Sequence, residues 1–176
     1  MPATADNFRP YPNSLFVETG TWHGDGIQAA LDAGFREVRS IELSPALHQQ
    51  ARTRFARRPE VKLWLGSSGE VLRDVIADVT EPATFWLDAH YSGGDSMLGP
   101  EACPVLLELA ILAEHPVKTH TLLIDDVRCF GSTYSVDVES VRRAISAINP
   151  AYRMSFDRSG WPQLGLDILV AVVGPA

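Results

Sequence analysis

Apolar residues gather in short continuous runs, and the segments between these runs carry apolar residues at helical spacing. Continuous apolar runs are typical of strands buried on both faces of a parallel sheet. The pattern predicts strands at residues 14–18, 37–43, 61–65, 84–88, 119–125, 152–156 and 166–173. It predicts helices at residues 27–33, 45–57, 68–77, 104–114 and 136–148.

Helix boundary signals support these assignments. Gly34 follows the first predicted helix, and glycine favours the left-handed conformation that ends helices. Ser44 and Pro45 begin the second helix, with serine as N-cap and proline at the first helical position. Strands that alternate with helices predict an α/β fold, a doubly wound, Rossmann-like parallel sheet of about seven strands with helices on both faces.

The last two predicted strands differ from the others in their connection. The short turn around Ser159 and Gly160 cannot carry a parallel crossover, so these strands form an antiparallel C-terminal hairpin. The length of 176 residues predicts a single domain over 1–176. Residues 1–13 are polar and rich in proline, and we expect an extended N-terminal arm there.

Composition excludes several classes of protein. No apolar run approaches the ~20 residues that span a bilayer, and the N-terminus lacks the apolar segment of a signal peptide. Two cysteines are too few for a disulfide framework and fit a cytoplasmic protein. The net charge of -7 argues against binding to nucleic acid phosphates. We therefore expect neither a membrane nor a nucleic acid as partner.

Four acidic residues stand at the carboxyl ends of predicted strands: Glu18, Glu42, Asp88 and Asp125. In open α/β sheets, ligands bind outside these ends, where the strand order reverses. The sequence therefore places a ligand site at this edge.

The first candidate motif is the loop from Glu18 to Gly26, with Gly20 and Gly24 in it. Glycine lets the backbone turn sharply and approach a ligand closely. Glu42, after the next strand, can accept hydrogen bonds from both ribose hydroxyls of an adenosine. The loop lacks the G-x-G-x-x-G spacing of dinucleotide sites, and its acid would repel a diphosphate but favour an ammonium and a sulfonium. A plain glycine turn without a ligand is the alternative.

The run Glu-Thr-Gly-Thr-Trp-x-Gly resembles the first motif of class I S-adenosylmethionine (SAM)-dependent methyltransferases. Trp22, in place of the usual middle glycine, is closest to the form in macrocin-type sugar O-methyltransferases. The resemblance implies that SAM is held by Glu18, Gly20, Thr21, Trp22, Gly24, Glu42, Leu43, Ser67, Ser68 and Asp88. In it, Glu18 lies near the amino group, Gly20, Thr21 and Gly24 along the methionine, Glu42 at the ribose, and Leu43 and Ser67-Ser68 at the adenine.

The second candidate motif combines Asp88 with Asp125 and Asp126, which follow two predicted strands that are neighbours in this fold. Three adjacent carboxylates repel one another unless a cation or protons intervene. Oxygen ligands select a hard ion such as Mg²⁺. Metal-dependent O-methyltransferases of the macrocin and catechol types resemble this arrangement. In the alternative, Asp88 alone contacts the ligand and Asp125 caps a loop.

His90 lies two residues beyond Asp88 and is the candidate general base, because its ordinary pKa of ~6.5 suits proton transfer. The alternatives are a histidine bonded to a loop carbonyl and a metal ligand. Arg128 and Tyr134 follow the aspartate pair and could reach the same cleft, but we interpret both as solvated surface residues.

Together these features predict a SAM-dependent methyltransferase, with Mg²⁺-assisted O-methylation of a small hydroxylated acceptor, sugar or natural-product-like. The alternatives are a metal-independent methyltransferase, a non-catalytic adenosine-nucleotide-binding module and a dehydrogenase. Larger relatives often carry N-terminal helices over the substrate. We expect the site here to be open, or to be closed by the loop at residues 91–99 or by the second subunit of a homodimer.

Overall fold

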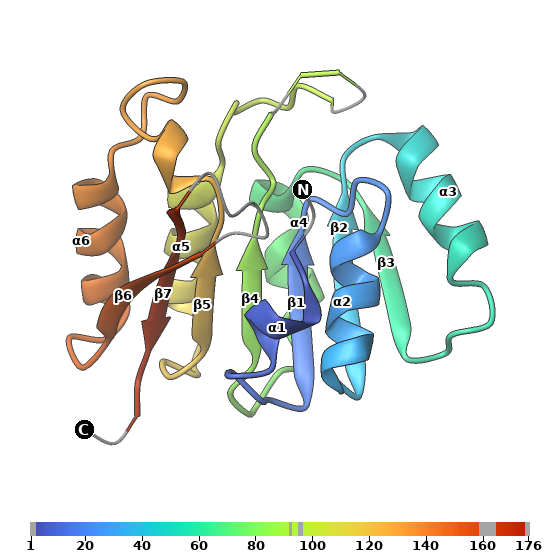
Figure 1. Ribbon diagram of the computed structural model, residues 1–176, viewed down its shortest axis with the longest axis horizontal. Helices are drawn as coiled ribbons and strands as arrows, with labels where there is room; N and C mark the ends of the chain where they lie inside the picture. The colour runs from blue at the N-terminus through green and yellow to red at the C-terminus, as the bar shows by residue number, and fades with distance from the viewer. Residues whose placement is uncertain (1–2, 92, 95–96, 159–164, 175–176) are drawn as a thin grey trace.

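The computed structural model describes residues 3–91, 93–94, 97–158 and 165–174. A seven-stranded sheet with helices on both faces forms its centre (Figure 1). The strands are β1 (Leu15–Thr19), β2 (Glu37–Glu42), β3 (Val61–Leu65), β4 (Thr84–Leu87), β5 (Thr121–Ile124), β6 (Arg153–Arg158) and β7 (Leu166–Val172). The α-helices are α1 (Ala5–Phe8), α2 (Asp25–Ala33), α3 (Pro45–Arg54), α4 (Ser68–Val75), α5 (Val105–Glu114) and α6 (Val138–Ile148), and η1 (Val127–Cys129) is a 3-10 helix.

The strand order is β3-β2-β1-β4-β5-β7-β6. Strands β1 to β5 are parallel, whereas β7 runs antiparallel to both β5 and β6. The chain builds outward from β1 to β3 and then returns to β4 on the other side of β1, so the strand order reverses between β1 and β4. These pairings confirm the predicted doubly wound sheet and its antiparallel C-terminal hairpin. The expected turn at Ser159 and Gly160 lies outside the described residues.

Two apolar clusters, one on each face, hold the layers together. Helices α1, α2 and α3 contribute to one, and α4, α5 and α6 to the other. Successive side chains of β4 point to opposite faces of the sheet and so enter different clusters. Phe85 and Leu87 pack with α4, α5 and α6, whereas Trp86 packs with α1, α2 and α3. The central strands therefore need apolar side chains on both faces, which explains their continuous apolar runs.

The N-terminal segment differs from the expected extended arm. It contains the short helix α1, and Phe8 at its end is fully buried. The Phe8 ring lies 4.6 Å from that of Phe16 and 5.3 Å from that of Trp86, measured between centroids. Burial of this one aromatic side chain fixes the segment against the sheet, a contact that local polarity does not reveal.

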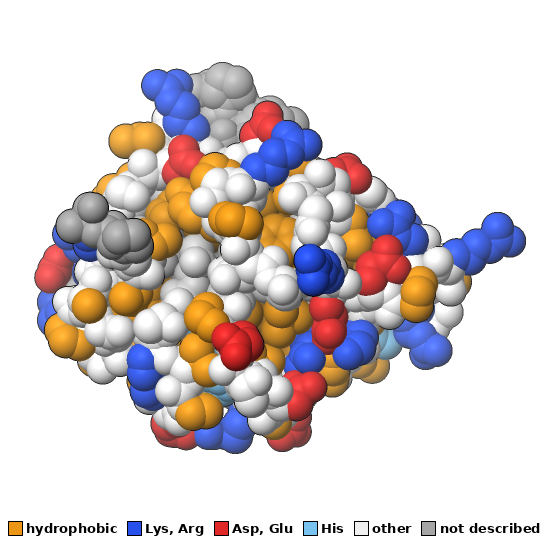
Figure 2. Space-filling view, turned by 90° about the horizontal axis from the view of Figure 1, so that it is seen from below, with side chains coloured by type: hydrophobic (Ala, Val, Ile, Leu, Met, Phe, Trp, Pro, Cys, Tyr) orange, Lys and Arg blue, Asp and Glu red, His pale blue; other side chains and the backbone are white. Residues whose placement is uncertain are grey.

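Helix α3 ends at Arg54, earlier than the predicted residue 57, because the Phe55 side chain turns inward and is buried. Within the described part of the chain, no helix has the length and apolar character needed to cross a bilayer. Basic and acidic side chains are interspersed on the face opposite the strand carboxyl ends (Figure 2).

A buried histidine pair lies at the other end of the sheet, away from these carboxyl ends. The backbone N–H of Ala83 donates to Nδ1 of His120 at 3.1 Å, so the His120 proton lies on Nε2 and is donated to Nδ1 of His115 at 3.0 Å. His115 then donates from Nε2 to the carbonyl of Ile76 at 3.2 Å. Burial lowers the pKa of His120 to about 4. The pair is thus built for neutral imidazoles.

This pair predicts acid sensitivity. The folded pKa of His120 lies below the ordinary value of ~6.5, so its contribution to stability is complete above pH ~6.5 and is lost as the pH falls toward about 4. The loss corresponds to about 3 kcal/mol of unfolding free energy. Urea unfolding of wild type and His120→Asn across this range measures it. The variant keeps an acceptor for Ala83, and an equally steep pH dependence in it would contradict the assignment.

Candidate active site

A cavity of about 290 Å³ opens at the carboxyl ends of β1, β2, β4 and β5, where the strand order reverses. Most of the predicted site residues line it: Gly20, Trp22, Glu42, Leu43, Ser67, Ser68, Asp88, His90, Asp125 and Asp126. The structure therefore brings most of the predicted residues to one cavity, whereas Glu18, Thr21 and Gly24 are buried and do not line it. Contact of any of these residues with a ligand stays a prediction.

Gly20 brings the loop after β1 against the end of β4. Its φ is +85°, and its backbone N–H donates to the carbonyl of Ile41 at 2.9 Å. A Cβ at this position would lie 2.5 Å from the carbonyl oxygen of Asp88. Only glycine satisfies both the left-handed backbone and this close approach.

We expect Gly20→Ala to weaken SAM binding by at least about tenfold, because relief of the overlap moves the loop or Asp88 away from the cavity. Calorimetric titration with SAM measures this effect. Gly34→Ala is the matched control, since Gly34 also has a left-handed φ of +100° but nothing lies within 4 Å of its added Cβ. Equal losses in the two variants would show that the effect is one of backbone strain alone.

Glu18 and Thr21 support this loop from beneath. Ser40 Oγ donates to Oε2 of Glu18 at 2.5 Å and also lies 2.5 Å from the Thr21 hydroxyl. All three side chains are buried, and burial raises the pKa of Glu18 well above its ordinary value. Gly24 caps α2 in a left-handed conformation. These residues shape the loop, and the Glu18 carboxylate, expected near the amino group of SAM, is buried and accepts the bond from Ser40.

Glu42 is held in place by two backbone donors. The N–H of Trp22 donates to Oε2 at 2.8 Å, and the N–H of Ser44 donates to Oε1 at 2.7 Å. The carboxylate is only 5% exposed but lines the cavity. Each carboxylate oxygen has a second lone pair, so both can still accept a hydroxyl proton. Leu43 and Leu47 provide an apolar wall next to it. This combination fits a ribose joined to a flat apolar base.

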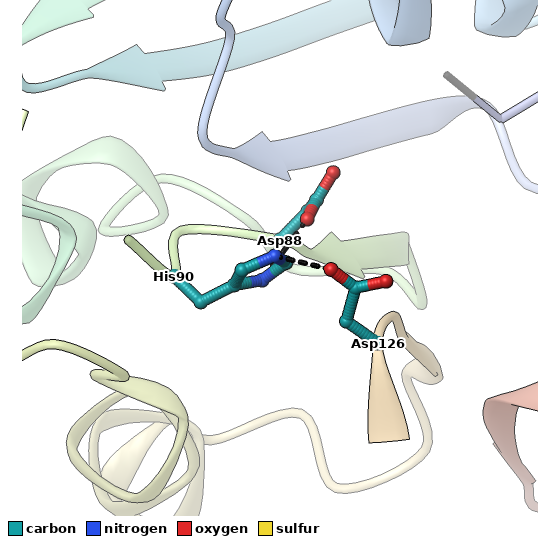
Figure 3. A group of neighbouring side chains, drawn as sticks. All are labelled: Asp88, His90 and Asp126. Carbon is teal, nitrogen blue, oxygen red and sulfur yellow. Dashed lines mark ion pairs between the residues drawn. The ribbon is translucent and has the colours of Figure 1, made fainter. Parts of the chain in front are cut away.

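Asp88, His90 and Asp126 form an acidic cluster (Figure 3), and all three also line the cavity. The His90 ring lies between two carboxylates, with Nδ1 3.2 Å from Oδ1 of Asp88 and Nε2 2.5 Å from Oδ2 of Asp126. The His90 side chain is only 7% exposed. Ligand atoms of these three residues lie within 4.8 Å of one another, which suits a divalent ion.

Burial and charge set the protonation of the cluster. Burial raises the pKa of Asp88 to about 6. Burial by itself would lower the pKa of His90, but the hydrogen bond with Asp126 and the charges of Asp88 and Asp126 raise it to about 9. Burial by itself would raise the pKa of Asp126, but the hydrogen bond with His90 and the charge of His90 lower that pKa below its ordinary value. At neutral pH, His90 is therefore a cation between two anions.

Asp125 belongs to a second group of candidate ligands, with Asp126 and Asp167, beside the group of Asp88, His90 and Asp126. Among the described residues, its buried Oδ1 has no hydrogen-bond partner. Burial and the charges of Asp88 and Asp126 raise the pKa of Asp125. The set that converges is thus Asp88, His90 and Asp126, with one nitrogen among its ligands rather than oxygens alone. The two carboxylates fit Mg²⁺ or Mn²⁺, whereas an imidazole nitrogen is a better ligand for Zn²⁺ or Fe²⁺.

Several residues near the cluster were not predicted as functional. Arg128 lines the cavity and pairs with Asp126 and with the fully buried Asp167. Tyr134, expected at the surface, is buried and donates its hydroxyl proton to the carbonyl of Tyr91 at 3.0 Å. A lone aspartate in the apolar run of β7 was a usable signal, because a buried acid requires a partner.

Trp86 and Glu108 were also missed. Trp86 donates from Nε1 to Oδ2 of Asp88 at 3.3 Å, and the two-residue period of a strand places both on one face. Glu108 on α5 is buried, and burial raises its pKa to about 7 beside the hydroxyls of Ser68 and Thr19. Its helix is almost wholly apolar, so Glu108 was recognisable as a buried acid.

No protein-family model and no curated protein sequence matches the chain. Solved structures do. An O-methyltransferase from Bacillus cereus in complex with SAH (the demethylated SAM) is 17% identical, with a TM-score of 0.69, over 97% of this chain and 78% of that one. The O-methyltransferase TomG from Streptomyces achromogenes, in complex with SAM, is 14% identical, with a TM-score of 0.66, over 97% and 78%.

The methyltransferase PaMTH1 from Podospora anserina, bound to SAH, is 13% identical, with a TM-score of 0.64, over 98% of this chain and 76% of that one. The agreement covers nearly all of this chain. The protein therefore has the fold of class I SAM-dependent O-methyltransferases.

Proposed function

We propose that this protein is a SAM-dependent O-methyltransferase. The observation that carries the proposal is one cavity with two chemically distinct sides. Glu42, fixed by two backbone amides beside Leu43, suits the adenosine of SAM. The cluster of Asp88, His90 and Asp126 opposite suits a hydroxyl group that must lose a proton. The fold shared with SAM- and SAH-bound methyltransferases supports the same function.

The proposed reaction is an in-line displacement. The acceptor oxygen bonds to the methyl carbon, the carbon–sulfur bond breaks, and the electron pair stays on the sulfur of SAH. Asp88 orients the hydroxyl, and His90 accepts its proton. Both nitrogens of His90 are engaged in the arrangement of Figure 3, so this role requires the form that has lost one proton. Placing the two reactants together can supply ~7–11 kcal/mol of the acceleration.

We further propose that Asp88 and Asp126 hold a divalent cation, Mg²⁺ in the first instance, with Asp125 near enough to assist. Such an ion stabilises a developing alkoxide. The buried Asp125 oxygen without a partner supports a missing cation in this part of the site. The acceptor would be a small hydroxylated molecule, sugar or natural-product-like, and the protein a cytoplasmic enzyme, as a homodimer, without nucleic acid or membrane partners.

A metal-independent methyltransferase is the second candidate, because His90 already neutralises Asp88 and Asp126. SAH release from SAM, measured with a panel of vicinal diols and catechols, tests the main proposal. Activity that EDTA abolishes and Mg²⁺ or Mn²⁺ restores would establish the metal, whereas unchanged activity in EDTA would favour the second candidate. SAM binding without turnover of any acceptor would favour a non-catalytic module, and binding of NAD instead of SAM a dehydrogenase.

A further inference from the structure

The cluster continues from the cavity lining to β7 as a row of charges of alternating sign. In order, the row consists of Asp88, His90, Asp126, Arg128 and Asp167, and each member contacts the next. It begins after β4, passes through the turn after β5 and ends on β7. The row therefore joins the candidate catalytic groups to the antiparallel hairpin of the sheet.

Asp167 is the fixed end of this row. Its side chain is fully buried on β7, and it binds Arg128 twice: Oδ1 accepts the backbone N–H at 3.0 Å, and Oδ2 contacts the guanidinium. A buried carboxylate is stable only when it is paired and hydrogen-bonded, so Asp167 needs Arg128 in this position. Both the backbone and the side chain of Arg128 are thereby held against β7.

Asp126 is the member of the row whose backbone conformation has to be stabilised by its neighbours. Its φ of +56° is left-handed, and a residue other than glycine keeps this strained conformation only when its surroundings impose it. The same Nη1 atom of Arg128 that contacts Asp167 also contacts Oδ1 of Asp126. The other oxygen of Asp126, Oδ2, holds Nε2 of His90 at 2.5 Å. Without Arg128, one side of the Asp126 carboxylate would lose its charged partner.

We propose that Arg128 and Asp167 are positioning residues, which hold Asp126 in its strained conformation and through it orient His90. Neither needs to contact a substrate for this role. The proposal concerns the geometry of the site that the proposed function uses, but it stands on contacts that are independent of the acceptor.

The test is proton NMR of the His90 Nε2–H in otherwise native protein labelled with ¹⁵N-histidine. A hydrogen bond of this kind, on a side chain 7% exposed, gives a downfield proton signal that exchanges slowly with water, and His90→Gln identifies it by loss. In Arg128→Gln and in Asp167→Asn, we expect exchange at least about tenfold faster, as for the loss of one charge-assisted hydrogen bond. The double variant should add little to either single change, because both act on one row.

Asp78→Asn is the matched control, since it removes a carboxylate from the pair with Arg39 far from the cavity, and it should leave the signal unchanged. Arg128→Lys, which keeps the charge, should restore part of the protection. An unchanged signal in both Arg128→Gln and Asp167→Asn, or its absence from wild type, would overturn the proposal. SAM titration of the same variants separates the two claims: failure of wild type to bind SAM would reject the proposed function but leave this inference standing.

Discussion

Glu42→Ala is expected to weaken SAM binding by about 100-fold or more, because two hydrogen bonds to a charged acceptor are lost, each worth about 1.5–3 kcal/mol. The carboxylate also anchors the backbone of Trp22 and Ser44, so its removal loosens the loop after β1 as well. Isothermal titration with SAM and with SAH, with and without Mg²⁺, measures the loss.

Glu70→Ala is the matched control for Glu42→Ala. It removes the same charge from the first turn of α4, two residues after Ser68 but outside the cavity lining. We expect SAM affinity within about twofold of wild type, because exposed charges contribute little across solvent. Full affinity in Glu42→Ala would remove the ribose assignment and with it the main support for SAM.

Addition of Mg²⁺ or Mn²⁺ is expected to lower the pKa of His90 from about 9 by roughly two units. Below pH ~9, His90 is protonated and lies between the two carboxylates that the ion requires, so a bound cation must displace its proton. Between the pKa of Asp88, about 6, and that of His90, metal affinity should therefore rise about tenfold for each pH unit. NMR titration of the His90 Cε1–H measures the pKa, and calorimetry measures the affinity.

The variants Asp126→Asn and His90→Gln test the two parts of this prediction separately: the pKa of His90 and the pH dependence of metal affinity. Asp126→Asn removes the carboxylate that raises the pKa of His90, so His90 should titrate well below 9 in EDTA. His90→Gln removes the competing cation, so metal affinity should lose its pH dependence above about pH 6. A His90 pKa unaffected by millimolar Mg²⁺ or Mn²⁺ would reject the metal site and favour catalysis without an ion.

The spacing of apolar residues and the signals that end helices and strands determined the architecture. Continuous apolar strands are buried on both faces of a sheet, and the short final link requires an antiparallel hairpin. The sheet and its helices could therefore be predicted from the sequence alone. The sequence also indicated the edge of the sheet at which the cavity lies, because Glu42 and Asp88 stand at the carboxyl ends of β2 and β4. The role of Gly20 could also be predicted, because glycine in a loop indicates a backbone conformation that other residues rarely adopt.

Tertiary structure alone decided which side chains meet. Glu18 and Glu42 both end strands, yet Glu18 is covered by Ser40 and the start of α2, whereas Glu42 faces the cavity. The candidate ligands that converge with Asp88 are His90 and Asp126. Asp126, in the turn after β5, contacts the His90 ring directly. Arg128 and Asp167 are 39 positions apart and are joined only because β7 pairs with β5. Local pattern encodes strand and helix, but contacts between distant side chains depend on packing that spacing does not specify.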